Sequence, residues 1–288
     1  PSPGAPMTAT VPDKATLHVG YGLVQREIHL EDWISLYVLK NGFRLHRIHG
    51  GTLYGKAVAE ALLERRDGEA RLISRLTVLR DGARLLVLES TAALNSFPKH
   101  AATFALAAGS LRFEEAAPIL GSESTEDVVM SSPFRIALTR PGSWRAHVEA
   151  DEPLGCQNLH LYNLGAGDIV GGYVTVRAFD RERFPAATPK ALLQGFLAQL
   201  SEQGLKLKKF PAKGLPEVDA KAFDRERVSE GFVREDSGTP VEAYATAVSS
   251  AKLVVLIAVV TPGMSASEGL WLSNRQAFRM AVETLKAD

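Results

Sequence analysis

The stretch VEAYATAVSSAKLVVLIAVVTPGMSASEGLWLSNRQAFRMAVETLKA (Val241–Ala287) indicates two strands followed by a helix. The runs Val241–Val248 and Val254–Val260 are apolar, rich in β-branched residues and separated only by SSAK, which predicts a β-hairpin. Further on, four apolar residues recur at helical spacing: Phe278, Ala281, Val282 and Leu285. Because this apolar face must be buried, we expect the helix to pack on the sheet that contains the hairpin.

The first half of the chain ends in the same order. Glu69–Leu79 and Arg84–Ala92 are strand-like, and the turn between them contains Asp81 and Gly82, a pair typical of tight hairpins. The segment SFPKHAATFALAAGSLRF then places five apolar residues on one helical face: Phe97, Ala101, Phe104, Ala108 and Leu111. The order hairpin then helix therefore occurs twice, as a weak internal repeat of pattern rather than of residues.

The remaining segments predict antiparallel sheets. In the first half we expect strands in QREIHL, WISLYVL and FRLHRIH (25–49) and a short helix in YGKAVAEALLER (54–65). In the second half we expect strands in FRIAL, from Trp144 onward, in CQNLHLYNL and in IVGGYVTVRAF, then a helix that Thr188 caps and Pro189 begins. Strand runs with helices between and after them indicate an α+β fold rather than a doubly wound parallel sheet.

The chain length and one linker-like stretch indicate two domains. A chain of 288 residues suits two domains of ordinary size. The stretch EEAAPILGSESTEDVVM is acidic and contains Pro118 and Gly121, the composition of a linker. We predict a flexible tether at 1–15, a first domain at 16–113, a linker at 114–127 and a second domain at 128–288.

The second half resembles the fold family of the photosystem accessory protein PsbP and the bacterial DcrB-like proteins. The resemblance rests on FRIALTRPGSWRAH, LHLYN, IVGGYVTVRAF, the helix after Thr188, the terminal hairpin and FRMAVETLK. It covers about half the chain well and the first half only in outline. It implies that Trp144 is a core anchor, which is also the usual role of a tryptophan after a turn. It further implies a non-catalytic accessory protein that binds a protein partner or assists assembly of a complex.

Composition excludes several kinds of protein. Lys plus Arg and Asp plus Glu number 33 each, so no overall charge attracts nucleic acid. Cys156 is the only cysteine, so the chain forms no internal disulfide and no cysteine metal site. The apolar run Ala251–Val260 is about half the length of a membrane helix.

The N-terminal PSPGAPMTAT has the composition of a flexible tether. It could follow a cleaved signal or a lipid-anchored cysteine upstream, or consist of vector residues. We expect a periplasmic or exported protein, with a cytoplasmic one as the alternative.

Side chains that could carry chemistry are few. His46 and His49 lie three apart in an expected strand, so they should face opposite sides and share no metal ion. Asn158, His160 and Tyr162 alternate along a strand and should share one face. His160 and Tyr162, together with Cys156, offer the alternative to a binding protein, which is a ligand-binding or hydrolytic enzyme. We expect no metal and no cofactor.

Two nearly identical hexapeptides, FDRERF (Phe179–Phe184) and FDRERV (Phe223–Val228), mix charge with aromatic residues. Such a repeat can arise by chance in an arginine-rich chain. Arg181 and Arg225 would otherwise contribute to a partner-binding surface, because arginine and aromatic residues are favoured at interface hot spots. The candidate binding residues are Trp144, His160, Tyr162, Arg181 and Arg225, and the oligomeric state is left open.

Overall fold

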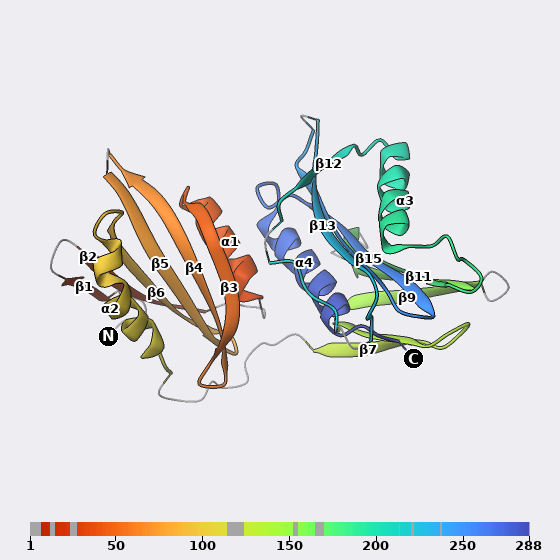
Figure 1. Cartoon of the computed structure of the whole chain (residues 1–288), viewed down its shortest axis with the longest axis horizontal. Helices are drawn as coiled ribbons and strands as arrows, with labels where there is room; N and C mark the ends of the chain where they lie inside the picture. Colours follow the sequence, from red (N-terminus) through yellow and green to blue (C-terminus); the bar gives the residue numbers. More distant parts are fainter. Residues whose placement is uncertain are drawn as a thin grey trace. The chain divides into compact units, whose positions relative to one another are not determined.

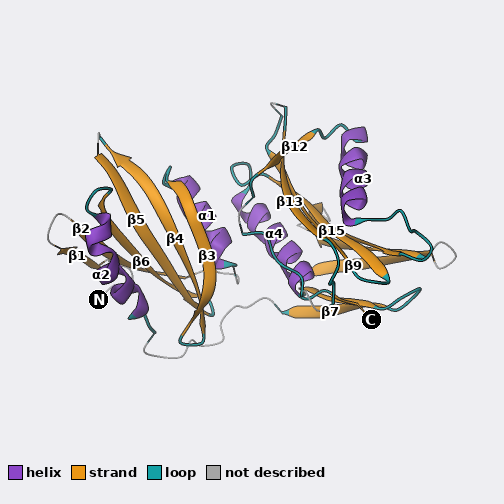
Figure 2. Ribbon diagram, in the orientation of Figure 1, coloured by secondary structure: helices purple, strands orange, loops and turns teal. Residues whose placement is uncertain are grey.

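The chain divides into two compact units, Pro1–Ser122 and Glu123–Asp288. The computed structural model describes residues 7–11, 15–23, 28–68, 70–113, 124–151, 155–164, 170–212, 214–219, 222–236 and 238–287. Each unit combines antiparallel strands with two helices (Figures 1 and 2). The antiparallel α+β class predicted from the sequence is therefore present in both units.

The described residues of the first unit form one six-stranded sheet. Its strands are β1 (Met7–Val11), β2 (Ala15–Leu23), β3 (Arg44–Leu53), β4 (Lys56–Asp67), β5 (Ala70–Asp81) and β6 (Arg84–Ala93). They lie in the order β1-β2-β6-β5-β4-β3, and every neighbouring pair is antiparallel. Strands β3 to β6 follow one another as hairpins, and β2 pairs with β6.

Two helices cover opposite faces of this sheet. Helix α1 (Leu30–Lys40) packs on β3, β4 and β5, and helix α2 (Phe97–Gly109) packs on β5 and β6. Beneath α1 lie Leu76 and Val78 of β5. Beneath α2 lie Leu79 of the same strand and Leu88 of β6. The two faces differ because successive strand side chains point to opposite sides.

The second unit contains a seven-stranded sheet and a three-stranded sheet. The larger has the order β12-β13-β14-β15-β11-β10-β9, and the smaller has the order β16-β8-β7. The strands are β7 (Thr125–Met130), β8 (Ile136–Pro141), β9 (Trp144–Asp151), β10 (Cys156–Leu164), β11 (Val170–Asp180), β12 (Leu207–Phe210), β13 (Arg227–Arg234), β14 (Val241–Ser249), β15 (Leu253–Pro262) and β16 (Lys286–Ala287).

Helices α3 (Pro189–Glu202) and α4 (Glu268–Glu283) cover the two faces of the larger sheet. Thr188 caps α3 by accepting a hydrogen bond from the Ala191 amide at 3.1 Å, as its sequence predicts. The apolar residues predicted for the terminal helix are all buried, with Leu285 just beyond its end. This large core also contains Trp144, which is 1% exposed, so its side chain is an anchor and not a ligand platform.

In the first unit one predicted strand is a helix, and one predicted helix is a strand. WISLYVL is part of helix α1, not a strand, and YGKAVAEALLER belongs mainly to strand β4, not to a helix. In α1 the residues that pack in the core on the sheet are Leu30, Ile34 and Val38, with Trp33 and Tyr37 beside them. This spacing of three and four positions outweighs the strand propensity of the aromatic and β-branched residues. In β4 the helix-favouring Ala, Glu and Leu alternate between buried and partly buried positions, because hairpins on both sides impose strand pairing.

The predicted linker is only partly described. Residues 114–123 lie outside the described residues, as do 24–27 of the predicted strand QREIHL. Thr125–Met130 forms β7, so the end of the predicted linker is a strand of the second unit. The proposed tether at 1–15 is also mostly outside the described residues, although Met7–Val11 pairs with β2.

Candidate functional site

Arg181 and Arg225 line the same pocket of the second unit. The pocket has a volume of about 530 Å³ and surrounds the turn between β14 and β15. Arg181 follows the end of β11 and Arg225 precedes β13, so the two hexapeptides flank this turn. We call this the hairpin-turn pocket; its lining includes Pro133, Phe134, Arg181, Pro185, Arg225 and Lys252.

Backbone hydrogen bonds hold both hexapeptides to the turn. The Arg181 amide donates to the Lys252 carbonyl at 2.8 Å, and the Arg225 amide donates to the Ser249 carbonyl at 3.2 Å. The Arg181 guanidinium also donates to the Ser250 carbonyl at 3.0 Å. These contacts fix where both arginines emerge, which is what a preformed binding surface requires.

The side chains of Arg181 and Arg225 differ in exposure and in hydrogen bonding. Arg181 is half-buried and its side chain supports the turn. Arg225 is exposed, and within the described part of the chain its side chain forms no hydrogen bond or ion pair. Lys252 adds a third cation, while Asp180 and Glu182 line the pocket as acids. The pocket thus combines arginines and the aromatic Phe134, which are residue types enriched at protein interfaces, with the acids and the lysine that are more common at an interface rim.

His160 and Tyr162 share one face of β10, as the alternation predicts, together with Tyr173 of β11. The ring centres of Tyr162 and Tyr173 are 5.2 Å apart, and those of His160 and Tyr173 are 5.3 Å apart. The Tyr173 hydroxyl and the Thr175 hydroxyl both lie within hydrogen-bond reach of His160 Nδ1. Glu149 Oε2 lies 3.9 Å from His160 Nε2.

Burial is the main influence on the titration of this cluster. It lowers the pKa of His160, an effect that Glu149 opposes and that Arg177 reinforces. Burial also raises the pKa of the Tyr173 phenol. At neutral pH a neutral imidazole therefore faces a protonated phenol, so Tyr173 can donate to Nδ1. The arrangement can form hydrogen bonds with a bound group.

Cys156 is not brought to this cluster. It lies four residues before His160 on the same strand, which corresponds to about 13 Å along β10. The thiol is half-buried, and at that separation His160 cannot act as its base. The three residues of the enzyme hypothesis therefore share a strand face without forming one reactive group.

The prediction that His46 and His49 face opposite sides of their strand is wrong. A β-bulge between Leu45 and Arg47 shifts the register of β3 against β4. As a result both imidazoles meet carboxylates of one β4 face: His46 Nε2 is 2.8 Å from Glu64, and His49 Nε2 is 3.5 Å from Glu60. Among the described residues, no three His, Cys, Asp or Glu side chains are placed to share a metal ion.

Two further groups of residues were not found from the sequence. In the first unit the Tyr37 hydroxyl donates to Glu89 at 2.7 Å, and the ring of Trp33 stacks on that of Tyr37. In the second unit the Trp271 indole donates to Glu242 at 2.8 Å, and the Tyr244 hydroxyl donates to the same oxygen. In each group one or more members come from distant parts of the chain, so sequence spacing gives no signal for either.

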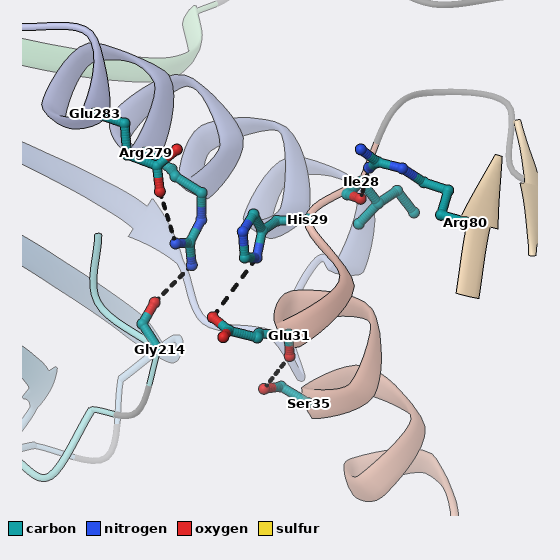
Figure 3. Close-up of polar contacts among 8 residues, drawn as sticks. All are labelled: Ile28, His29, Glu31, Ser35, Arg80, Gly214, Arg279 and Glu283. Carbon is teal, nitrogen blue, oxygen red and sulfur yellow. Dashed lines mark hydrogen bonds and ion pairs between the residues drawn. The ribbon is translucent and has the colours of Figure 1, made fainter. Parts of the chain in front are cut away.

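Polar contacts on α1 and α4 have a structural role. Figure 3 shows the Ser35 hydroxyl donating to the Glu31 carbonyl within α1, at 2.8 Å. It also shows Arg279 of α4 donating to Glu283 at 3.2 Å and to the Gly214 carbonyl at 2.5 Å. Because Arg279 is buried, these bonds satisfy its charge and tie α4 to the segment around Gly214.

No family model and no curated protein matches the chain. Among solved structures it has weak similarity to PA94 from Pseudomonas aeruginosa, with a TM-score of 0.34, 16% identity, and coverage of 39% of this chain and 84% of that one. It is also weakly similar to TplEi, an immunity protein of the T6SS from Pseudomonas aeruginosa, with a TM-score of 0.23, 12% identity, and coverage of 98% and 97%. A chain of the Tle4–Tli4 complex has a TM-score of 0.21, 12% identity, and coverage of 97% and 98%.

Within the described ranges, none of the helices combines the length and the apolar character needed to cross a membrane.

Proposed function

We propose that the protein is a non-catalytic accessory protein that binds a protein partner through the hairpin-turn pocket of its second unit. The observation that carries this proposal is the convergence of Arg181 and Arg225, from two separate hexapeptides, around one β-hairpin turn. Arg181 braces the turn, while the exposed Arg225 lines the same pocket as Phe134, Pro133 and Pro185. Arginine and aromatic side chains supply a large share of binding energy at protein interfaces.

We also propose a domain organisation and a cellular compartment for this protein. A tandem PsbP-like organisation, with one such domain in each of the two units, fits an accessory factor, and we propose export to the periplasm or beyond. By their names, two of the solved chains above are an immunity protein and a member of a two-protein complex. Proteins connected with a T6SS are therefore included among the partners to be tested.

The experiment places a photo-crosslinking amino acid at position 225 of the full chain in its native cell. We expect one protein to be crosslinked at 225 and not at 208, an exposed lysine position on edge strand β12 that serves as the matched control. Arg225→Glu should reduce copurification of that protein by at least about tenfold, since a charge-assisted contact contributes about 1.5–3 kcal/mol. Lys208→Glu should not. Equal crosslinking at both positions, or copurification unchanged by Arg225→Glu, would reject the proposal.

A second candidate, a ligand-binding or hydrolytic enzyme, rests on His160 and its bond with Tyr173. It predicts that His160→Ala abolishes an activity in a folded protein. The partner-binding proposal predicts that both His160→Ala and Cys156→Ser retain partner binding.

A further inference from the structure

A groove on the first unit lies beside helix α1, on the part of the sheet face that this helix leaves uncovered. Helix α1 packs on β3, β4 and β5, whereas β6 and β2 continue the same face beyond it. The groove has a volume of about 320 Å³. We call it the α1 groove; its lining includes Gly20, Gly22, Trp33, Tyr37, Val87 and Glu89.

Two glycines keep the floor of the α1 groove open. Gly20 pairs with Val87 and Gly22 pairs with Leu85 across the β2–β6 ladder. A Cβ atom built on either glycine has no other atom within 4 Å, and neither glycine has a positive φ. The backbone therefore does not require glycine at these positions. Their effect is to leave a space that side chains at positions 20 and 22 would fill.

The wall of the α1 groove is aromatic. Trp33 and Tyr37 are one helical turn apart and stack with ring centres 5.5 Å apart and planes 15° apart. Both side chains are half-buried. Stacked, partly exposed aromatic faces attract flat cations, and guanidinium groups in particular.

A buried carboxylate ends the groove. Glu89 is 9% exposed and accepts hydrogen bonds from Tyr37 at 2.7 Å, Ser74 at 3.0 Å and Thr91 at 3.3 Å. All three donors are neutral hydroxyl groups. Within the described ranges no lysine or arginine forms an ion pair with Glu89. Arg65 is close enough to act on the pKa of Tyr37, but its guanidinium lies over Phe43, 5.7 Å from the ring centre. A buried carboxylate that is held only by hydroxyl donors favours a directly paired cation, so the groove is electrostatically complementary to a positive group.

The second unit contains a similar group of tryptophan, tyrosine and glutamate, in which an arginine covers the aromatic rings. There Trp271 and Tyr244 both donate to Glu242. The guanidinium of Arg275 lies over the two rings, 4.2 Å from the centre of Tyr244 and 4.9 Å from that of Trp271. In the α1 groove Trp33, Tyr37 and Glu89 line an open pocket, with Tyr37 as the donor to Glu89, and the described residues that line it include no arginine.

We propose that the α1 groove binds an arginine side chain from an exposed segment of a partner protein. Its alkyl stem lies over Gly20 and Gly22, its guanidinium stacks beside Trp33 and Tyr37, and its N–H groups donate to Glu89. Arginine fits better than lysine because its planar cation stacks on aromatic rings, pairs with carboxylates in two-point contacts and is less strongly hydrated. This site is separate from the hairpin-turn pocket and does not depend on it.

The test uses the full chain, labelled with ¹⁵N, and the blocked peptide Ac-Gly-Arg-Gly-NH₂. The chain has three tryptophans, and Trp144 and Trp271 are buried in the second unit. We expect saturable shifts of the Trp33 indole N–H and of the Gly20 amide, with no shift of the other two indoles. The same peptide with citrulline, which has the shape of arginine without its charge, should bind at least about tenfold more weakly.

Three variants complete the test. Glu89→Gln should weaken binding by about tenfold or more, because it removes the charge and keeps the size. Gly20→Val should abolish binding, since its side chain enters free space and fills the floor without a clash. Gly51→Val, a strand glycine on β3 outside the groove, is the matched control and should bind normally.

Several results would overturn the proposal. They are the absence of saturable Trp33 shifts, equal binding of the citrulline peptide, and full binding by a folded Gly20→Val variant. Self-association of the free protein that Glu89→Gln abolishes would assign the groove to a second copy of this chain instead. Arg225→Glu should leave peptide binding unchanged, so this test fails or succeeds independently of the hairpin-turn pocket.

Discussion

The two groups of tryptophan, tyrosine and glutamate differ mainly in what covers them. Trp271 and Tyr244 are each 2% exposed, and Arg275 of the same helix as Trp271 completes their group. Trp33 and Tyr37 are only half-buried, and their group borders an open groove. The same residue types thus stabilise a core in one unit and remain accessible in the other. The surrounding strands and helices decide which role is available.

The largest expected effect separates the two tryptophans. Trp271→Ala should lower the free energy of unfolding of the second unit by about 3–5 kcal/mol, because it empties a large buried site. Trp33→Ala should lower that of the first unit by about 1 kcal/mol, since part of its ring already faces solvent. Urea unfolding followed by circular dichroism measures both. Equal losses would show that the two groups are covered alike and would break the comparison.

A glycine-to-alanine substitution in each unit compares how closely the backbone is packed. A Cβ on Gly172 of β11 would come within 1.9 Å of Asn274 on α4, so Gly172→Ala should destabilise the second unit by about 1–3 kcal/mol. Gly20→Ala enters open space and should instead stabilise the first unit by about 0.4–1 kcal/mol, by restricting the unfolded chain. Thermal unfolding of the two variants gives both signs. A destabilising Gly20→Ala would mean that the floor of the α1 groove is occupied.

The hydroxyl group of Tyr37 provides a smaller test. Burial first, and then its hydrogen bond to Glu89, raises the pKa of Tyr37 well above its ordinary value, so the hydroxyl stays protonated as the donor. Tyr37→Phe should cost about 1 kcal/mol of stability, and it should also weaken the peptide binding described above. A Tyr37→Phe variant with unchanged unfolding would indicate that solvent replaces this bond at no cost.

The smallest effect concerns an ion pair remote from both groups. Hydrogen bonds from Arg71 and then His46 lower the pKa of Glu64 to about 2. Because the folded pKa lies below the unfolded value, this contribution to stability is present above about pH 4.5 and is lost as the pH falls toward 2. Carboxyl NMR titration should show the depressed pKa of Glu64, and Arg71→Ala should move it back toward its ordinary value. A Glu64 pKa unaffected by Arg71→Ala would contradict this assignment.

Sequence pattern predicted elements well where one period dominated. The β14–β15 hairpin and helix α4 follow from a continuous apolar run and from helical spacing at Phe278 and Ala281. In α1 two signals competed. Aromatic and β-branched residues favoured a strand. The spacing of Leu30, Ile34 and Val38, with the acidic Glu31 and Asp32 in the first turn, favoured a helix.

The candidate sites were less accessible to sequence reasoning. The hexapeptides identified Arg181 and Arg225 as a pair, but only the pairing of β13, β14, β15 and β11 places both at one turn. His46 shows the opposite case, since one extra residue in β3 overturned an argument that assumed strict alternation. Glu89 and its groove depend on contacts between β2, β6 and α1, which no local pattern encodes.

The small sheet of the second unit can be completed only late in the synthesis of the chain. Strand β8 pairs on one side with β7 and on the other with β16, and the Thr139 amide donates to the Thr284 hydroxyl at 2.8 Å, across a sequence separation of 145. At about 5–20 residues per second, a ribosome needs about 7–30 s to supply that partner. Throughout this delay one edge of β8 stays open, whereas the hairpins of the first unit can already close. A nascent chain halted before α4 lacks both Thr284 and β16 and should therefore be protected from protease in its first unit and cleaved in its second.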